Sequence, residues 1–200
     1  MESTPLSIVW PCRLSVEEYA AAGRQVEVPR QDCPDCERPL KRWAGYERPI
    51  RSGRGYRIWI RRGRCPPCEK THALLPDFVH ERRYDAVEVI GAALELGISG
   101  RGMQKVAEET GVPFTTARGW RRRHRAGAAV LLQRFAELAL KLGVGLGEPG
   151  TDIERAALMA LKEVWSKVQQ RVASCWRFWN AVCGGRALAT NTSSPLARTG

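Results

Sequence analysis

Several common features are missing from this chain of 200 residues, and each absence narrows the class of protein. No run approaches the roughly 18 apolar residues that a membrane-spanning helix needs. The first thirty residues lack the basic start, the apolar core and the small-residue cleavage site of a signal peptide. We therefore expect a cytoplasmic protein with no membrane partner, whose cysteines stay reduced.

Arrangements typical of catalysis are also missing. The three histidines lie near basic stretches, and neither a Ser-His-Asp nor a Cys-His pattern is visible. Asp152, Glu154 and Glu163 fall on one predicted helix, whereas a nuclease of the RNase H type presents its acids from a sheet. We predict that the chain is not an enzyme. A nuclease or transposase subunit with unrecognised acids stays as an alternative.

Cysteine is present in an odd number, seven, which fits a disulfide framework poorly. Four of the seven form two Cys-x-x-Cys turns, Cys33 with Cys36 and Cys65 with Cys68. Two such turns can place four thiolates around one tetrahedral Zn²⁺. A thioredoxin-like redox pair would need a neighbouring βαβ pattern, which neither turn has. We predict one structural zinc ion bound by these four cysteines.

Two details of this predicted site stay open. The position after the second cysteine of such a turn is usually glycine, but here it is Glu37 and Glu69. His72, three residues after Cys68, is an alternative fourth ligand or a hydrogen-bonding neighbour.

A β-hairpin is predicted between the two cysteine turns. The sequence "SGRG" at residues 52–55 is a turn signal, and the following residues alternate between apolar Tyr56, Ile58 and Ile60 and a second set containing Arg57 and Arg61. A hairpin closed by two cysteine turns is typical of a zinc ribbon. The ion then stabilises a domain too small to bury much apolar surface.

Positive charge is abundant: the net charge is +11, mostly from arginine, whose planar head matches phosphate oxygens. Residues 37–72 contain eleven Lys and Arg against three Glu, with aromatic residues between them. We expect this hairpin to contact a DNA backbone through Arg57, Arg61 and Arg62. The alternative is a solvated cationic face that binds nothing, or a ribbon that binds a protein.

Helical periodicity begins after the second cysteine turn. Apolar residues spaced three and four apart predict a helix over 85–96, followed by a short helix over 103–110 and another from residue 114 to residue 125. Gly111 lies between the last two, and a glycine-containing turn between short helices is the mark of a helix–turn–helix.

The second helix of this pair is predicted to enter the major groove of double-stranded DNA, because residues 114–125 contain five arginines and no acid. Ala117 and Trp120 would face the core. A helical unit that contacts only proteins is the alternative. The predicted outward, DNA-contacting residues are Phe114, Thr115, Thr116, Arg118, Arg121, Arg122 and Arg125.

The remaining sequence predicts further helix. An apolar stripe continues through residue 142, glycines break the chain at 143–150, and a capping box from Thr151 to Glu154 opens one long helix that continues to Trp176. The aromatic residues of this helix form either a core or the interface of a homodimer. Residues 184–200 are small and polar, which predicts a flexible tail.

Several phrases resemble a bacterial family known only as a domain of unknown function, whose members look like the front end of insertion-sequence transposases. They are "VWPCRLSVEEYAAAGR", "CPDCERPLKRW", "RIWIRRGRCPPCEKTHALLPDF", "VEVIGAAL", "GVPFTTARGWRRRHR" and "GGRALATNT". The resemblance implies a zinc ribbon and a helix–turn–helix that recognise DNA ends. In those transposases a separate RNase H-like domain carries the catalytic acids. Residues 126–200 depart from that pattern, so no catalytic triad is carried over to this chain.

Together these observations predict a mainly α protein with a small β zinc ribbon. The predicted units are an N-terminal arm over 1–30, the ribbon over 31–80, the helix–turn–helix over 81–126, C-terminal helices over 127–183 and the tail. The predicted function is zinc-dependent, sequence-specific DNA binding at the bacterial nucleoid, by a regulator or a transposase-derived protein.

Overall fold

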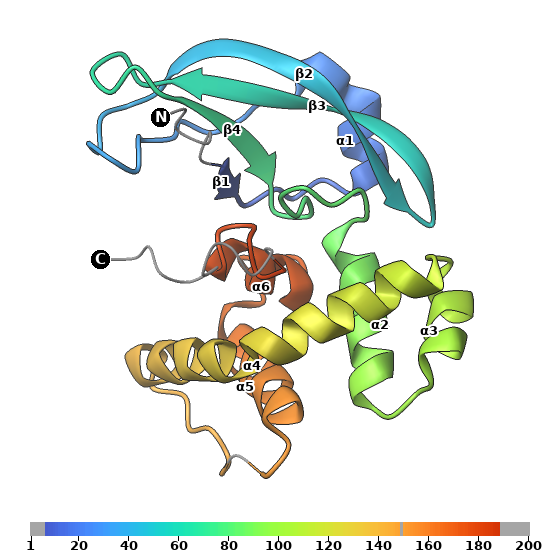
Figure 1. Ribbon diagram of the computed structural model, residues 1–200. Coiled ribbons are helices and arrows are strands. Elements are labelled where there is room, and N and C mark those ends of the chain that lie inside the picture. Colours follow the sequence, from blue (N-terminus) through green and yellow to red (C-terminus); the bar gives the residue numbers. More distant parts are fainter. Residues whose placement is uncertain (1–6, 149, 189–200) are drawn as a thin grey trace.

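The computed structural model of the chain describes residues 7–148 and 150–188. In these residues a four-stranded mixed sheet lies above a layer of helices, and six α-helices are present in all (Figure 1). Apolar residues of both layers form one continuous core, which includes Ile58 of the sheet and Trp179 of the last helix. The units predicted over 31–80, 81–126 and 127–183 therefore share their apolar core.

The predicted hairpin is confirmed as β2 (Lys41–Ser52) and β3 (Arg54–Arg64), two long antiparallel strands. They turn at Gly53, whose φ of 71° lies in the left-handed region that glycine tolerates best. The predicted alternation also holds, because Ile58 and Ile60 are fully buried while Arg57 is exposed. The register places Lys41 opposite Arg64, so the two cysteine turns lie at the same end of the hairpin.

Two further strands enlarge the sheet beyond the predicted hairpin. β4 (Thr71–Pro76) pairs antiparallel with β3, and β1 (Ser7–Trp10) pairs parallel with β4, which gives the order β1-β4-β3-β2. The N-terminal arm also forms α1 (Val16–Ala22), which begins with a capping box of Ser15 and Glu18 and ends in a 3₁₀ turn, η1 (Gly23–Gln25). Tyr19 of α1 is fully buried, and its hydroxyl donates to the Trp59 carbonyl.

The helices after the sheet begin close to the predicted residues. α2 (Val87–Ile98) is followed by α3 (Met103–Thr110), whose bounds agree with the prediction. Gly111 ends α3 with a left-handed φ of 67°, and α4 (Phe114–Leu142) then runs without a break across the lower layer (Figure 1). Ala117 and Trp120 are buried as expected.

The prediction of one long helix from residue 151 to Trp176 is wrong. The structure has α5 (Ile153–Val168) and α6 (Cys175–Val182), separated by a turn. Ser174 accepts a hydrogen bond from the Arg177 N–H and starts a new helix, and the Trp165 indole donates to the Val172 carbonyl inside the turn. Side-chain bonds of this kind compete with continuation of a helix.

The predicted capping box at Thr151 is also wrong. Asp152 is the N-cap of α5, and its carboxylate accepts from the Arg155 N–H at 3.2 Å. Glu154 does not turn back to the cap but faces α4. Charge complementarity with α4 therefore outweighs the local capping preference.

The aromatic residues of the C-terminal segment pack inside the chain. Trp176 and Trp179 are buried and meet edge to face, with ring centroids 5.6 Å apart. Gly91 of α2 lies so close that a Cβ atom there would come within 2.2 Å of the Trp176 ring. These side chains serve as core, while the homodimer stays a prediction.

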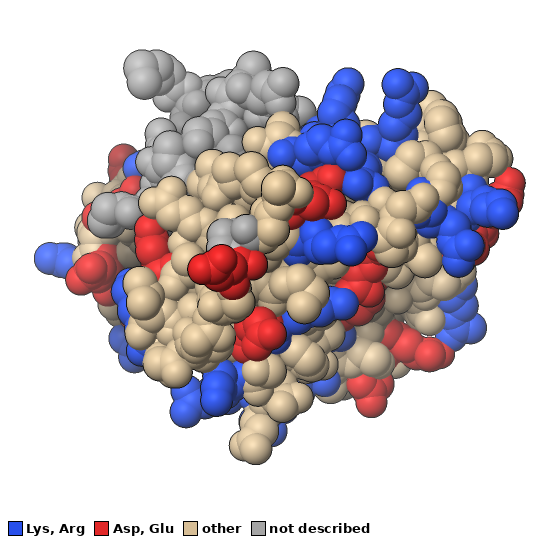
Figure 2. All heavy atoms as spheres, turned by 90° about the horizontal axis from the view of Figure 1, so that it is seen from below, with Lys and Arg blue, Asp and Glu red and all other residues tan. Residues whose placement is uncertain are grey.

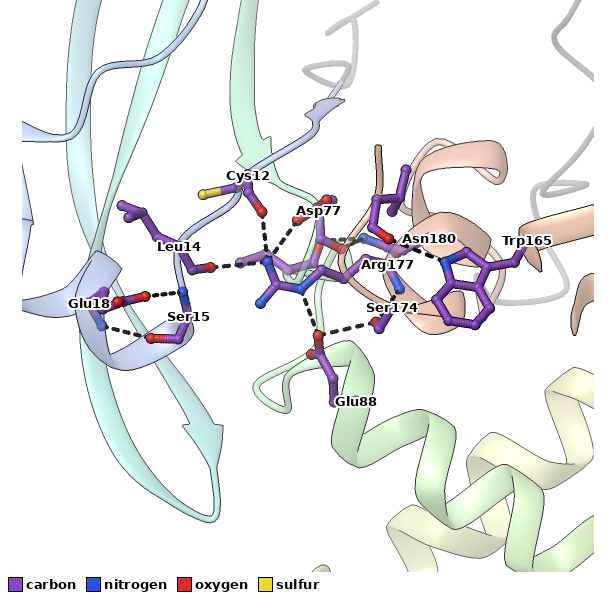
Figure 3. Close-up of polar contacts among 12 residues, drawn as sticks. Cys12, Leu14, Ser15, Glu18, Asp77, Glu88, Trp165, Ser174, Arg177 and Asn180 are labelled. Carbon is purple, nitrogen blue, oxygen red and sulfur yellow. Dashed lines mark hydrogen bonds and ion pairs between the residues drawn. The ribbon is translucent and has the colours of Figure 1, made fainter. Parts of the chain in front are cut away.

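Arg177 of α6 connects the two layers (Figure 3). Its buried guanidinium donates to the carbonyls of Cys12 and Leu14 in the N-terminal arm at 2.7 and 3.0 Å. It also lies 3.4 Å from Asp77, after β4, and 2.7 Å from Glu88 of α2. One side chain thus joins four segments, and burial raises the pKa of Asp77 to about 6 although Arg177 opposes this rise.

The chain after α6 folds back on the loop that follows β4. The Gly185 carbonyl accepts from the Glu81 N–H at 2.9 Å, and Leu188 is fully buried. Of the predicted tail over 184–200, residues 189–200 lie outside the described residues. None of the described helices combines the length and apolarity needed to cross a membrane.

Candidate metal centre and nucleic-acid surface

The two cysteine turns are built alike. In the first, the Cys33 N–H donates to the Arg38 carbonyl at 2.8 Å, and in the second the Cys65 N–H donates to the Lys70 carbonyl at the same distance. A salt bridge of 3.0 Å from Lys70 to Asp35 links one turn to the other. The long hairpin brings these turns together although they are far apart in the sequence.

The structure brings the four predicted cysteines into one cluster. Their Sγ atoms all lie within 4.8 Å of one another, with 3.4 Å between Cys36 and Cys65 and 3.9 Å between Cys33 and Cys68. Four thiolates bound to a tetrahedral ion with metal–sulfur distances of about 2.3 Å would have sulfurs about 3.8 Å apart. The cluster can therefore hold a metal ion with little movement.

The two glutamates that replace the usual glycines adopt the conformation that glycine normally supplies. Glu37 has a φ of 58° and Glu69 a φ of 54°, both in the left-handed region. This conformation is costly for a residue with a Cβ atom. The turns thus keep the geometry of a metal knuckle in spite of their sequence, because the cluster and the backbone bonds determine it.

The protonation of the cluster depends on its surroundings. A hydrogen bond from the Arg38 backbone is the main cause that lowers the pKa of Cys36 to about 7. The neighbouring thiols of Cys36 and Cys65 raise the pKa of Cys68 to about 12. Sulfurs this close cannot all ionise on their own, and a bound dication would stabilise all four thiolates.

His72 lies beside the cluster. Its Nε2 atom is 3.8 Å from Cys33 Sγ, and the side chain is fully buried. Cys33, Asp35 and His72 also form a possible three-residue metal group. Because four thiols already complete a tetrahedron, the geometry favours His72 as a hydrogen-bonding neighbour of Cys33.

Basic and aromatic side chains surround the cysteine end of the hairpin. Trp43 is 57% exposed, and the Arg64 guanidinium lies 4.8 Å from the centroid of its ring. Other cations at this end are exposed to solvent: Arg38, Lys41 and Arg42.

The three hairpin arginines predicted to contact DNA have different surroundings. Arg57 is exposed and pairs with Glu47 at 3.0 Å. Arg61 donates to the carbonyls of Arg24 and Val26 and so fixes the N-terminal arm. Arg62 donates to the Thr71 hydroxyl. Arg57 is thus exposed to solvent, Arg62 is half-buried, and Arg61 has a structural role.

The predicted residues of α4 divide into two groups. Phe114 (39% exposed), Thr115, Arg118 and Arg122 face solvent, whereas Thr116 is half-buried. Within residues 7–148 and 150–188, Arg118 and Arg122 have no acidic partner. Figure 2 shows basic side chains protruding on the right of the lower face, where α3 and the start of α4 lie.

Arg121 and Arg125 instead meet Glu154 of α5. The Glu154 carboxylate receives two hydrogen bonds from Arg121, at 2.7 and 2.8 Å, and one from Arg125 at 3.1 Å. Burial alone would raise the pKa of Glu154, but bonds from His124, Arg121 and Arg125 lower it well below its ordinary value. The structure thus places Arg121 between two helices rather than on the predicted outer surface, while Arg125 stays 68% exposed.

Arg177 and Glu154 were not predicted as interaction centres. Both residues could have been noticed in the sequence. Arg177 is the one charged residue in the aromatic segment "CWRFWN", and Glu154 is one of the few acids in a helix that follows an arginine-rich helix. Partner identity, however, follows only from the packing of helices distant in sequence.

Comparison with known proteins bears on the first half of the chain. Residues 33–112 match the family described as Domain of unknown function (DUF6431). The matched region begins at Cys33 and ends at Val112, so it contains the cysteine cluster and α3 but not α4. No match was found among the curated proteins or the solved structures. The matched family has no stated activity, so the resemblance to transposases stays a prediction.

Proposed function

We propose that the chain is a zinc-containing protein that binds double-stranded DNA and recognises its sequence. In this proposal the β2–β3 hairpin with its cysteine cluster is a zinc ribbon, and α3, the Gly111 turn and α4 act as a helix–turn–helix. The proposal describes a binding protein rather than an enzyme. It is supported by the roles of the acids near α5, because Asp152 caps the helix and Glu154 pairs with arginines.

Zinc is the proposed ion because four cysteines are the donor set of a closed structural site. The Sγ distances of 3.4 and 3.9 Å lie near those of a tetrahedral tetrathiolate. Zinc has no redox chemistry, and its proposed role is structural: it would hold the two cysteine turns together. Cys33, Cys36, Cys65 and Cys68 would be its ligands.

The exposed stripe at the start of α4 carries the DNA-binding proposal. Phe114, Arg118 and Arg122 are spaced four residues apart, so they lie on one side of the helix, with Thr115 beside them. Arginine can donate two hydrogen bonds to guanine, and phenylalanine or the threonine methyl can contact thymine. The stripe lies on the first three turns of the second helix, where recognition helices contact base edges.

The structure refines the predicted set of contacts. Arg121 is removed because Glu154 occupies its guanidinium, and Arg61 because it binds carbonyl groups of the arm. Arg125 and Arg57 remain as candidates for phosphate contacts, since both side chains are largely exposed, whereas Arg62 is half-buried and lines a groove between the sheet and the loop after β4. Phosphate contacts would supply much of the affinity, and the stripe on α4 the discrimination.

A random-oligonucleotide selection with the metal-loaded protein tests the proposal. The selected duplex is then titrated with wild type and with Arg118→Ala/Arg122→Ala, which we expect to bind about 100-fold more weakly and with less sequence preference. Lys167→Ala/Arg171→Ala is the matched control, because it removes two exposed charges from the end of α5 and the turn that follows it. Wild-type binding should also weaken steeply with salt.

Two results would contradict the proposal. One is a selection that enriches no sequence, together with a duplex affinity that does not change with salt. The other is an equal loss of affinity in both double variants, which would show that net charge matters and the stripe on α4 does not.

A further inference from the structure

A groove of about 610 Å³ opens between the sheet and the loop that joins β4 to α2, away from the α4 stripe. Residues of β2, β3 and β4 form one side, including Tyr46 and Arg62, and the loop contributes Arg82 and Tyr84. This volume is within the range of sites that bind small organic ligands, roughly 300–1,000 Å³.

Two tyrosines from different elements line the groove. Tyr46 of β2 is 39% exposed and Tyr84 of the loop is 67% exposed, so both rings are open to a ligand. Tyr84 is held in place through its backbone, because its carbonyl accepts from the Arg51 N–H at 2.6 Å and the next residue, Asp85, binds the Arg51 side chain. An exposed ring on a fixed backbone loses little entropy when a ligand stacks on it.

Arg48 of β2 fixes the loop itself. This half-buried side chain donates to the carbonyls of His80 (at 2.8 Å) and Arg83. His80 is also held on both ring nitrogens: Nδ1 lies 2.9 Å from the Glu81 carbonyl, and Nε2 accepts from the Leu188 N–H at 3.1 Å. The side of the groove formed by the loop is therefore a rigid part of the fold.

The groove has a surplus of positive charge for a ligand. Its two acids are already paired with arginines outside the groove, Glu47 with Arg57 at 3.0 Å and Glu81 with Arg186 at 2.7 Å. Arg62 donates to a neutral hydroxyl and has no acidic partner in the described part of the chain.

Arg82 adds a second guanidinium to this groove. It is 71% exposed and lies at a longer 3.7 Å from Glu81. Arg82 also has a left-handed φ of 57°, a strained conformation that recurs at ligand-binding positions.

We propose that this groove binds one nucleotide unit, with the base stacked against Tyr84 or Tyr46 and the phosphate bound by Arg62 and Arg82. Stacking on an aromatic face tolerates every base, so we expect little base preference. The unit can come from a free nucleotide or from an unpaired stretch of a nucleic-acid strand. This site is separate from the α4 stripe and does not need the duplex-binding role.

Fluorescence anisotropy with a labelled twelve-residue single-stranded thymidine oligonucleotide, in low salt, measures binding to the metal-loaded protein. We expect Tyr84→Ala to bind about ten-fold more weakly, because one stacked base is lost, and Tyr84→Phe to bind like wild type. Arg82→Ala should also weaken binding. Trp43→Ala is the matched control, since it removes an exposed aromatic ring at the cysteine end of the sheet. Circular dichroism verifies that each variant is folded.

Competition identifies the source of the nucleotide. Displacement of the oligonucleotide by thymidine monophosphate at a similar concentration assigns the groove to free nucleotides, and failure to displace it assigns the groove to strands. Arg118→Ala/Arg122→Ala should leave single-strand binding unchanged while it weakens duplex binding, so the two proposals can fail separately. The groove proposal is overturned if wild type binds neither probe, or if Trp43→Ala weakens binding and Tyr84→Ala does not.

Discussion

The cysteine end of the sheet and the helical layer of this molecule are held together in different ways. At the cysteine end most residues of β2 are exposed, and even the large side chain of Trp43 is 57% exposed, so it buries little apolar surface. In the helical layer, Trp179, Phe135 and Leu131 are at most 2% exposed. The helical layer therefore depends on many weak apolar contacts, whereas the proposed metal–thiolate bonds would hold the cysteine end together.

The difference has a physical origin in the size of each region. The cysteine end of the hairpin has apolar neighbours on few sides, so burial contributes little there, and a metal ion bound by the four cysteines would supply the missing stability. The helices bury their apolar stripes against one another and against the sheet, with Gly91 allowing α2 to approach Trp176 closely. Arg177 binds the N-terminal arm, Asp77 and Glu88, and so adds polar bonds between the sheet and the helices, which also share one apolar core.

The largest effect that separates the two regions is expected for Cys36→Ser. Loss of one thiolate should remove the ion, whose binding free energy in small zinc domains is on the order of 10 kcal/mol. The measured metal content should fall from one ion per chain to none. Hydrogen exchange should become fast in the two cysteine turns and the adjoining strand ends, residues 33–42 and 63–71, while the helical signal in circular dichroism is kept. Cys175→Ser, which removes a thiol outside the cluster, is the control. An unchanged metal content in Cys36→Ser would contradict the tetrathiolate site.

Trp179→Ala tests the opposite region. Removal of this fully buried ring should lower the free energy of unfolding by about 3–5 kcal/mol, because it leaves a cavity in the core. Denaturant unfolding measures the loss, and the purified variant should still contain one metal ion per chain. Trp43→Ala, at 57% exposure, should cost much less. If both variants lost the metal, the two regions would not be independent.

The same contrast explains which features could be predicted from the sequence. The two cysteine turns, the hairpin and the bounds of α3 each depend on local spacing and on turn residues such as Gly53 and Gly111. The hairpin then brings the two cysteine turns together. These features were predicted correctly. Arg118 and Arg122 were placed on one helix face from their four-residue spacing alone, and both are exposed on α4.

Features that depend on distant packing were not predicted. β1 joins β4 across more than sixty residues, and the Arg121 to Glu154 pair forms only because α5 packs along α4. Periodicity shows that a helix has a polar face, but it does not show whether a second helix covers that face. The break before α6 was missed because the apolar spacing continues across a turn that Ser174 and Trp165 stabilise by side-chain bonds.

Glu154→Gln tests the electrostatic part of the helical layer. The pKa of Glu154 is lowered in the folded chain, so the carboxylate stabilises the fold above about pH 4.5 and loses this effect as the pH falls further. At pH 7 the variant should be about 3 kcal/mol less stable, because Arg121 loses its charged partner in a nearly buried site. Urea unfolding at pH 7 and at pH 3.5 should show a smaller difference at the lower pH. Glu163→Gln, exposed on the same helix, should match wild type at both; a pH-independent difference for Glu154→Gln would exclude the ion pair as the cause.

The smallest effect is expected in the cysteine turns and has the opposite sign. Glu37 has a left-handed φ of 58°, which costs a residue with a Cβ atom about 1–2 kcal/mol, while glycine adds about 0.5–1 kcal/mol of entropy to the unfolded chain. Glu37→Gly should therefore stabilise the metal-loaded protein by about 0.5 kcal/mol in denaturant unfolding. Glu47→Gly makes the same exchange in the middle of β2, where the backbone is extended, and should destabilise it. Equal destabilisation by both changes would mean that the turn conformation carries no strain, and that the glutamates contribute to the metal site through their side chains.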